Sequence, residues 1–134
     1  MSIAALQLLA VAFGGAIGGV LRYGISGCVA RRMGESFPWG TLVVNVSGAA
    51  LIGVVAGIAA AQEWPVSGET THWALLVVGV LGSYTTVSAF SHQTLSLLHS
   101  GEPGRAAANI AASVGLCLGA VAAAYLAVGL LVGA

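Results

Sequence analysis

The sequence is poor in charge. Only 6% of its 134 residues are charged, and lysine and aspartate are absent. A soluble domain carries about 25% charged residues, so this composition excludes an ordinary water-facing surface. Because 58% of the residues are hydrophobic, the chain is predicted to be an integral membrane protein. The four arginines and four glutamates cancel, which argues against nucleic-acid partners and against a polybasic lipid-binding patch.

Carboxylates are also missing from the apolar segments, because every glutamate lies between them. Small four-helix multidrug transporters depend on such a carboxylate, so a proton- or cation-coupled carrier is disfavoured. No nucleophile–base arrangement, phosphate loop or metal cluster is recognisable, and an enzyme is not expected. Cys28 and Cys117 lack a metal-binding spacing and are interpreted as small packing residues.

Four segments reach the length of about 20 apolar residues that a membrane-spanning helix needs. They are about 4–27, 39–61, 72–98 and 106–132. The loops between them are too short for a soluble domain, so residues 1–134 are predicted to form one four-helix transmembrane domain. The first segment is long enough to span and follows no positively charged region, so we do not expect a removable signal peptide.

Glycine is abundant, with 20 residues, and recurs at a spacing that lets helices approach closely in lipid. The pairs are Gly14/Gly18, Gly15/Gly19, Gly53/Gly57 and Gly115/Gly119. This pattern predicts a compact bundle or an oligomer. Because four helices enclose little space, any pathway is expected at a subunit interface. The loops on one side of the membrane carry only a modest excess of arginine over those on the other side, which is compatible with insertion in both orientations.

Several polar residues fall inside the predicted spans, where each needs a partner. Asn45 has Thr41 four residues earlier on the same helix face, and is either a pore-lining amide or a helix–helix hydrogen-bonding group. Arg22, near the end of the first span, either reaches out to water or marks an anion entrance. Ser113 on the fourth span lines a polar stripe or bonds back to its own helix.

The third span contains the hydroxyl-rich stretch GSYTT, residues 82–86. Its hydroxyls either bond back to an ordinary helix or accompany a break in the helix at mid-membrane. Non-helical backbone at that depth survives only where protein buries it or where it lines a cavity. A break would free carbonyl groups near Gly82 and Thr85 that can coordinate a cation.

Three strings carry a resemblance: GGAIGGVLRY, FPWGTLVVNVSG and GVLGSYTTVSAFS. In order, spacing and helix assignment they resemble the CrcB/Fluc family of fluoride channels over nearly the whole chain. The resemblance implies a passive, fluoride-selective channel in the bacterial plasma (inner) membrane that lets fluoride leave the cytoplasm and so relieves its toxicity. It also implies an antiparallel, dual-topology dimer of four-helix subunits, with a structural Na⁺ at its centre.

The resemblance also implies residue roles. The carbonyls of Gly82 and Thr85 would bind the sodium ion, and Arg22 would stand at the entrance. The fluoride pathway would be lined by residues of the second, third and fourth spans: Asn45, Phe90, Val87, Thr41, Ser88, Ser113 and Thr86.

The sequence departs from the family pattern around the expected break. Val87 replaces the first of two pathway phenylalanines, and Ala89 and Gln93 replace a threonine and the usual glutamate. On the fourth span Asn109 stands where a tyrosine is often seen, and Cys117 where a serine is. Fluoride is therefore expected to permeate more slowly. The alternatives left open are a subunit that is non-conducting or needs a paralogous partner and, more remotely, a small coupled transporter.

Overall fold

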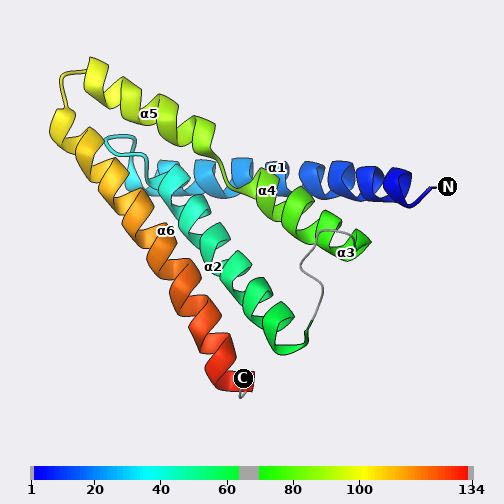
Figure 1. Cartoon of the computed structure of the whole chain (residues 1–134). Coiled ribbons are helices and arrows are strands. Elements are labelled where there is room, and N and C mark those ends of the chain that lie inside the picture. Colours follow the sequence, from blue (N-terminus) through cyan, green and yellow to red (C-terminus); the bar gives the residue numbers. More distant parts are fainter. Residues whose placement is uncertain (1, 64–69, 133–134) are drawn as a thin grey trace.

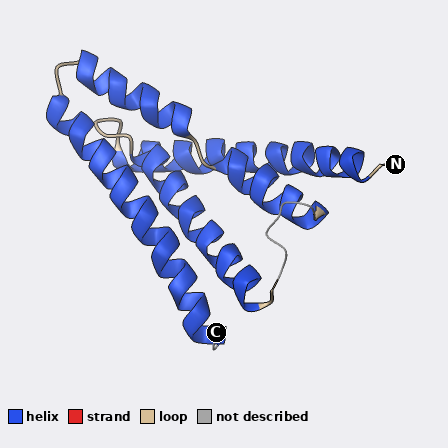
Figure 2. Ribbon diagram, in the orientation of Figure 1, coloured by secondary structure: helices blue, strands red, loops and turns tan. Residues whose placement is uncertain are grey.

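The computed structural model describes residues 2–63 and 70–132, and its elements within these ranges are all helical (Figure 2). In chain order they are α1 (Ile3–Met33), α2 (Trp39–Ala61), α3 (Thr71–Trp73), the π-helix η1 (Ala74–Leu81), α4 (Gly82–Tyr84), α5 (Val87–His99) and α6 (Pro103–Val132). Taking Thr71–His99 as one run, four helices are long and apolar enough to cross a membrane. The described part of the chain is therefore all-helical and contains four helices suited to span a membrane.

Local signals set the ends of α1. The Ser2 hydroxyl accepts a hydrogen bond from the Ala5 N–H (3.3 Å) and caps the first turn. Gly34 ends the helix with φ 81°, and its N–H donates to the Ala30 carbonyl (2.9 Å). The helix thus continues to Met33 instead of ending near residue 27, because no proline precedes Gly34 and the glycines before it all keep helical backbone. Arg22 lies well inside α1 and not near its end as the sequence predicted.

The third span is interrupted. Helix α4 ends at Tyr84, and Thr85 (ψ 161°) and Thr86 (φ −152°, ψ 122°) are extended. Helix α5 then begins at Val87, with the Thr86 hydroxyl accepting the Ala89 N–H (3.2 Å) as its cap. The span is therefore two helical halves joined by two extended residues.

The helices pack as two groups (Figure 1). Helices α2 and α6 run side by side in the same direction, while α1 crosses η1 and α4. Close approach depends on glycine: a Cβ at Gly18 would meet the Val80 carbonyl, and one at Gly53 would meet the Val121 carbonyl. Backbone therefore touches backbone at both contacts, as small residues allow in membrane helices.

The remaining glycine pairs have a different role. A Cβ at Gly15, Gly19, Gly115 or Gly119 would meet nothing within 4 Å. Of the four glycine pairs, Gly14/Gly18 and Gly53/Gly57 pack within the chain, whereas the other two adjoin open space. These two pairs leave open glycine strips on α1 and α6.

The apolar exterior is far larger than the core. Buried apolar residues in the described part of the chain are Leu42, Val44, Ala59, Ala74, Leu81, Tyr84 and Ala106. Large aliphatic side chains such as Leu8 and Leu130 are instead 71% and 87% exposed. Such a surface is stable only against lipid or another apolar chain.

The glycine contact predicts a matched pair of variants. Gly18→Ala should lower the free energy of unfolding by about 1–3 kcal/mol, because the methyl group would collide with η1 backbone. Gly24→Ala, in open space on the same helix, should leave it unchanged or slightly higher. Denaturant titration of the purified protein in detergent measures both, and equal losses would contradict the close contact.

Candidate functional site

Asn45 on α2 holds the extended segment of the third span through both ends of its side-chain amide. The Thr86 N–H donates to Asn45 Oδ1 (2.7 Å), and Asn45 Nδ2 donates to the Thr86 carbonyl (2.9 Å). In an unbroken helix the Thr86 N–H would donate to the Gly82 carbonyl. Asn45 thus replaces a missing peptide partner, and the Gly82 carbonyl is left without its helical donor.

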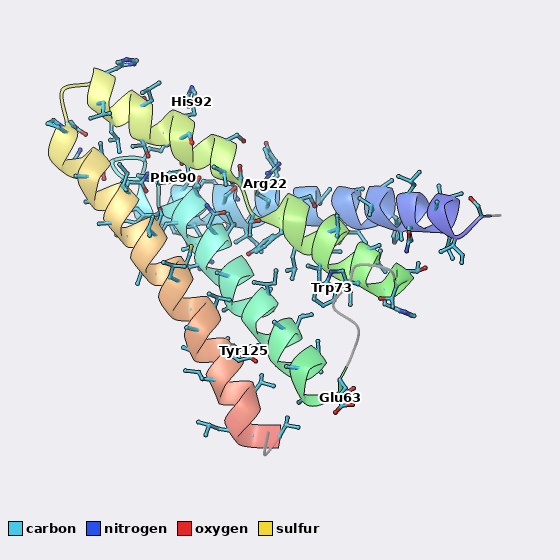
Figure 3. The ribbon with its side chains drawn as sticks, viewed as in Figure 1. Arg22, Glu63, Trp73, Phe90, His92 and Tyr125 are labelled. Carbon is cyan, nitrogen blue, oxygen red and sulfur yellow. The ribbon has the colours of Figure 1, made fainter. Side chains whose placement is uncertain are left out.

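The Thr85 carbonyl loses its helical donor in the same way. That donor would be the Ala89 N–H, which instead caps onto the Thr86 hydroxyl (3.2 Å). Thr85 O accepts a long hydrogen bond from Arg22 Nη1 (3.4 Å). Figure 3 shows Arg22 where α1 passes the junction of α4 and α5. The carbonyls of Gly82 and Thr85 are therefore among those that lose their helical donors at the interruption.

Other contacts brace the same segment. The Ser47 hydroxyl on α2 and the Tyr84 hydroxyl lie 2.8 Å apart in a hydrogen bond. Gly48 leaves room for Thr85, because a Cβ there would collide with the threonine methyl group. The hydroxyls of Ser83 and Thr85 bond back to the carbonyls of Gly79 (2.7 Å) and Leu81 (3.1 Å). The third span therefore contains both a break and hydroxyls that bond back to the helix, although the sequence presented these as alternatives.

A cavity of about 820 Å³, here the Arg22 cavity, opens beside the interruption. Arg22, Thr41, Thr86 and Ser88 line it, and the Thr86 and Ser88 hydroxyls are 3.2 Å apart. The other lining residues are Gly19, Tyr23, Ser26, Gly27, Ala30, Gly34, Glu35, Phe37, Pro38, Trp39, Gly40, Val44, Ala89, His92, Gln93, Ser96 and Leu97. This polar cavity reaches the interruption through Thr86.

A smaller cavity of about 310 Å³, here the Cys117 cavity, also adjoins the interruption. Asn45, Gly82, Thr85, Thr86 and Val87 line it, together with Gly48, Ala49, Ile52, Val77, Leu81 and Cys117. Thr86 lines both cavities. The side chain of Val87 is 77% exposed, so it stands free at the surface of the single chain.

A buried polar chain links α5 to α6. Asn109, 2% exposed, donates through Nδ2 to the Thr94 hydroxyl (2.8 Å), which donates to the Phe90 carbonyl (2.8 Å). Ser113 is buried, and its hydroxyl has no hydrogen-bond partner among the described residues, so it does not bond back to its helix. Phe90 and Ser113 line neither cavity. Nothing in the sequence pointed to the Thr94 or Ser47 contacts.

The chain's own groups limit what cation it can hold. Within the described residues, no three His, Cys, Asp or Glu side chains come together as a metal site. The freed Gly82 and Thr85 carbonyls are neutral oxygen donors, which fit a hard monovalent cation. A divalent ion would need carboxylates to offset its charge.

These features define a multi-pass membrane protein whose third span is interrupted and braced by an asparagine of the second. The family model for CrcB-like proteins, Camphor Resistance (CrcB), matches residues 9–125. The chain belongs to the CrcB family.

Named relatives agree with this assignment. The chain is 50% identical to fluoride-specific ion channel FluC 2 of Bradyrhizobium diazoefficiens, covering 89% of this chain and 86% of that protein. It is 50% identical to FluC 3 of Brucella suis, with 93% and 92% covered. FluC of Opitutus terrae is also 50% identical, with 84% and 85% covered.

The bracing amide predicts a local exchange effect. Asn45→Leu should speed hydrogen–deuterium exchange of the Thr86 amide roughly 5- to 150-fold, the range corresponding to a lost bond of about 1–3 kcal/mol. Asn109→Leu removes a buried amide elsewhere and should leave that exchange rate unchanged. Exchange resolved by NMR measures both variants; an unaltered Thr86 rate in Asn45→Leu contradicts the brace.

Proposed function

We propose that this protein is a fluoride-specific ion channel of the bacterial cell membrane, through which fluoride leaves the cytoplasm passively. The carrying observation is identity of about 50% over most of the chain to relatives named fluoride-specific ion channels. The relatives are channels, which fits the expectation that the protein is not an enzyme. Four spans with no carboxylate inside the apolar core support a passive route over a coupled carrier.

A second copy completes the channel, as an antiparallel, dual-topology dimer with pathways at the subunit interface. In one chain, only 11% and 6% of the most apolar windows of α1 and α6 are buried. The open glycine strips on these helices support close helix contact with a partner in lipid. The exposed Val87 and the freed carbonyls also need cover.

A structural Na⁺ at the dimer centre would be held by the carbonyls of Gly82 and Thr85, and its positive charge would bind the two interruptions together. The fit rests on these two neutral oxygens, which have both lost their helical donors in each chain. The interruption then lies at mid-membrane. Asn45 keeps these oxygens in place by holding Thr86.

Selectivity arises from replacing fluoride's tight hydration shell with protein donors along a narrow path. Asn45 retains one Nδ2 hydrogen beyond its bond to Thr86, and the unpartnered Ser113 hydroxyl can donate as well. The side chains of Thr41, Thr86 and Ser88 line the Arg22 cavity, and their hydroxyls offer further donors to fluoride on its way to Asn45. The Phe90 ring edge carries partial positive charge, whereas Val87, which stands where the family has its other pathway phenylalanine, has no such edge.

The proposal predicts fluoride efflux from liposomes that contain only this purified chain. Fluoride should leave while chloride is retained, because a narrow path of few donors does not accommodate the larger ion. Ion-selective electrodes record both anions. A well-folded dimer that releases no fluoride would contradict a homomeric channel and favour a paralogous partner subunit.

The departure at Val87 predicts a gain of function. Val87→Phe should raise fluoride flux several-fold, because it adds a polarised ring edge to each pathway without burying a charge. Val78→Phe places the same ring on another exposed position of the third span and should leave flux unchanged. Unchanged or reduced flux in Val87→Phe speaks against a pathway role for this residue.

A further inference from the structure

Arg22 is half-buried in the wall of the Arg22 cavity, and its guanidinium is almost unpaired. Of its five N–H donors, one donates to the Thr85 carbonyl, and the others have no hydrogen-bond partner among the described residues. The ion pair found within those residues joins Arg105 to Glu102 (2.8 Å), not Arg22 to an acid. A partly desolvated cation with free donors attracts a hard anion.

The single bond that Arg22 makes is easily exchanged. Its length of 3.4 Å exceeds the usual range of 2.7–3.2 Å for N–H···O bonds. A charge-assisted bond to an anion is shorter and roughly twice as strong as one to a neutral acceptor. An anion entering the cavity beside the Thr86 and Ser88 hydroxyls therefore outcompetes the Thr85 carbonyl for this donor.

The Thr85 carbonyl, which has lost its helical donor, is also one of the two oxygens proposed to hold the cation. Arg22 and a cation at that oxygen repel one another, because both are positive. Withdrawing Arg22 toward an anion leaves the oxygen fully available. Anion and cation then favour each other's binding through a shared residue, and linkage requires the effect to be reciprocal.

We propose that Arg22 is a positioning residue that passes its guanidinium between the Thr85 carbonyl and a hard anion bound in the Arg22 cavity. The inference rests on the proposed function, since it takes fluoride as the anion and Thr85 as a sodium ligand. Arg22 then links anion binding in the cavity to the availability of the Thr85 carbonyl for a cation, a role beyond that of an entrance charge.

The sequence offers a direct probe of the Thr85 carbonyl. Thr–Thr pairs occur only at Thr70–Thr71 and Thr85–Thr86. With threonine labelled by ¹³C at the carbonyl and ¹⁵N at the amide, an HNCO spectrum contains just these two pairs. The Thr85 carbonyl is read through the Thr86 amide, which Asn45 holds. The Thr70 carbonyl serves as an internal reference far from the cavity, and Thr71→Ser assigns its signal.

Titration of the wild-type protein with sodium fluoride against sodium gluconate should move the Thr85 carbonyl signal and leave the Thr70 signal in place. Arg22→Met, which lacks donors, should abolish the movement, while Arg32→Met, an exposed arginine on the same helix, should retain it. An unmoved Thr85 signal in the wild type overturns the proposal without any variant. So does equal movement in Arg22→Met.

Reciprocity gives a second readout. The fluoride concentration at half-movement should be at least about 5-fold lower in sodium gluconate than in N-methylglucamine gluconate. Equal midpoints overturn the link to the cation. Fluoride efflux from the same preparations separates the two ideas: a conducting protein with an unmoved Thr85 signal refutes only the inference, whereas a non-conducting one refutes the proposed function.

Discussion

An unpaired peptide group inside a membrane protein is the constraint on which this architecture depends. Two extended residues, Thr85 and Thr86, interrupt the third span, and their backbone groups need partners that lipid does not offer. The Asn45 amide satisfies Thr86 on both sides, at 2.7 and 2.9 Å. Without a side chain of that shape and polarity, the segment would revert to continuous helix or remain unsatisfied.

The rest of the fold brings helices close enough for this brace to work. Gly14 and Gly18 let α1 lie against the η1 and α4 backbone, which sets the third span beside α2. On α2, Gly48 lies about one turn from Asn45 and leaves room for the Thr85 side chain. These close approaches are compatible with a very small core, because most apolar surface faces outward instead of inward. The close helix contacts therefore matter more for placing Asn45 against the interruption than for the apolar surface they bury.

The site had several features that could be anticipated from the residues and several that could not. Asn45 stood out because an amide in an apolar helix must find a partner. Its partner could not be deduced, since Thr86 lies 41 positions away and hydroxyls alone do not distinguish a break from back-bonding. The Arg22 contact was hidden for another reason: α1 continues to Met33, so the arginine meets the third span instead of an interface with water.

Composition and local pattern by themselves determined that the chain is helical, spans a membrane four times and carries its polar chemistry in the third span. These properties follow from counts and from short-range rules of solvation. Only the tertiary structure decided which carbonyls are freed, which glycine pairs pack within the chain, and which hydroxyls line a cavity. Those outcomes depend on the rotation and crossing of helices distant in sequence, which no local pattern encodes.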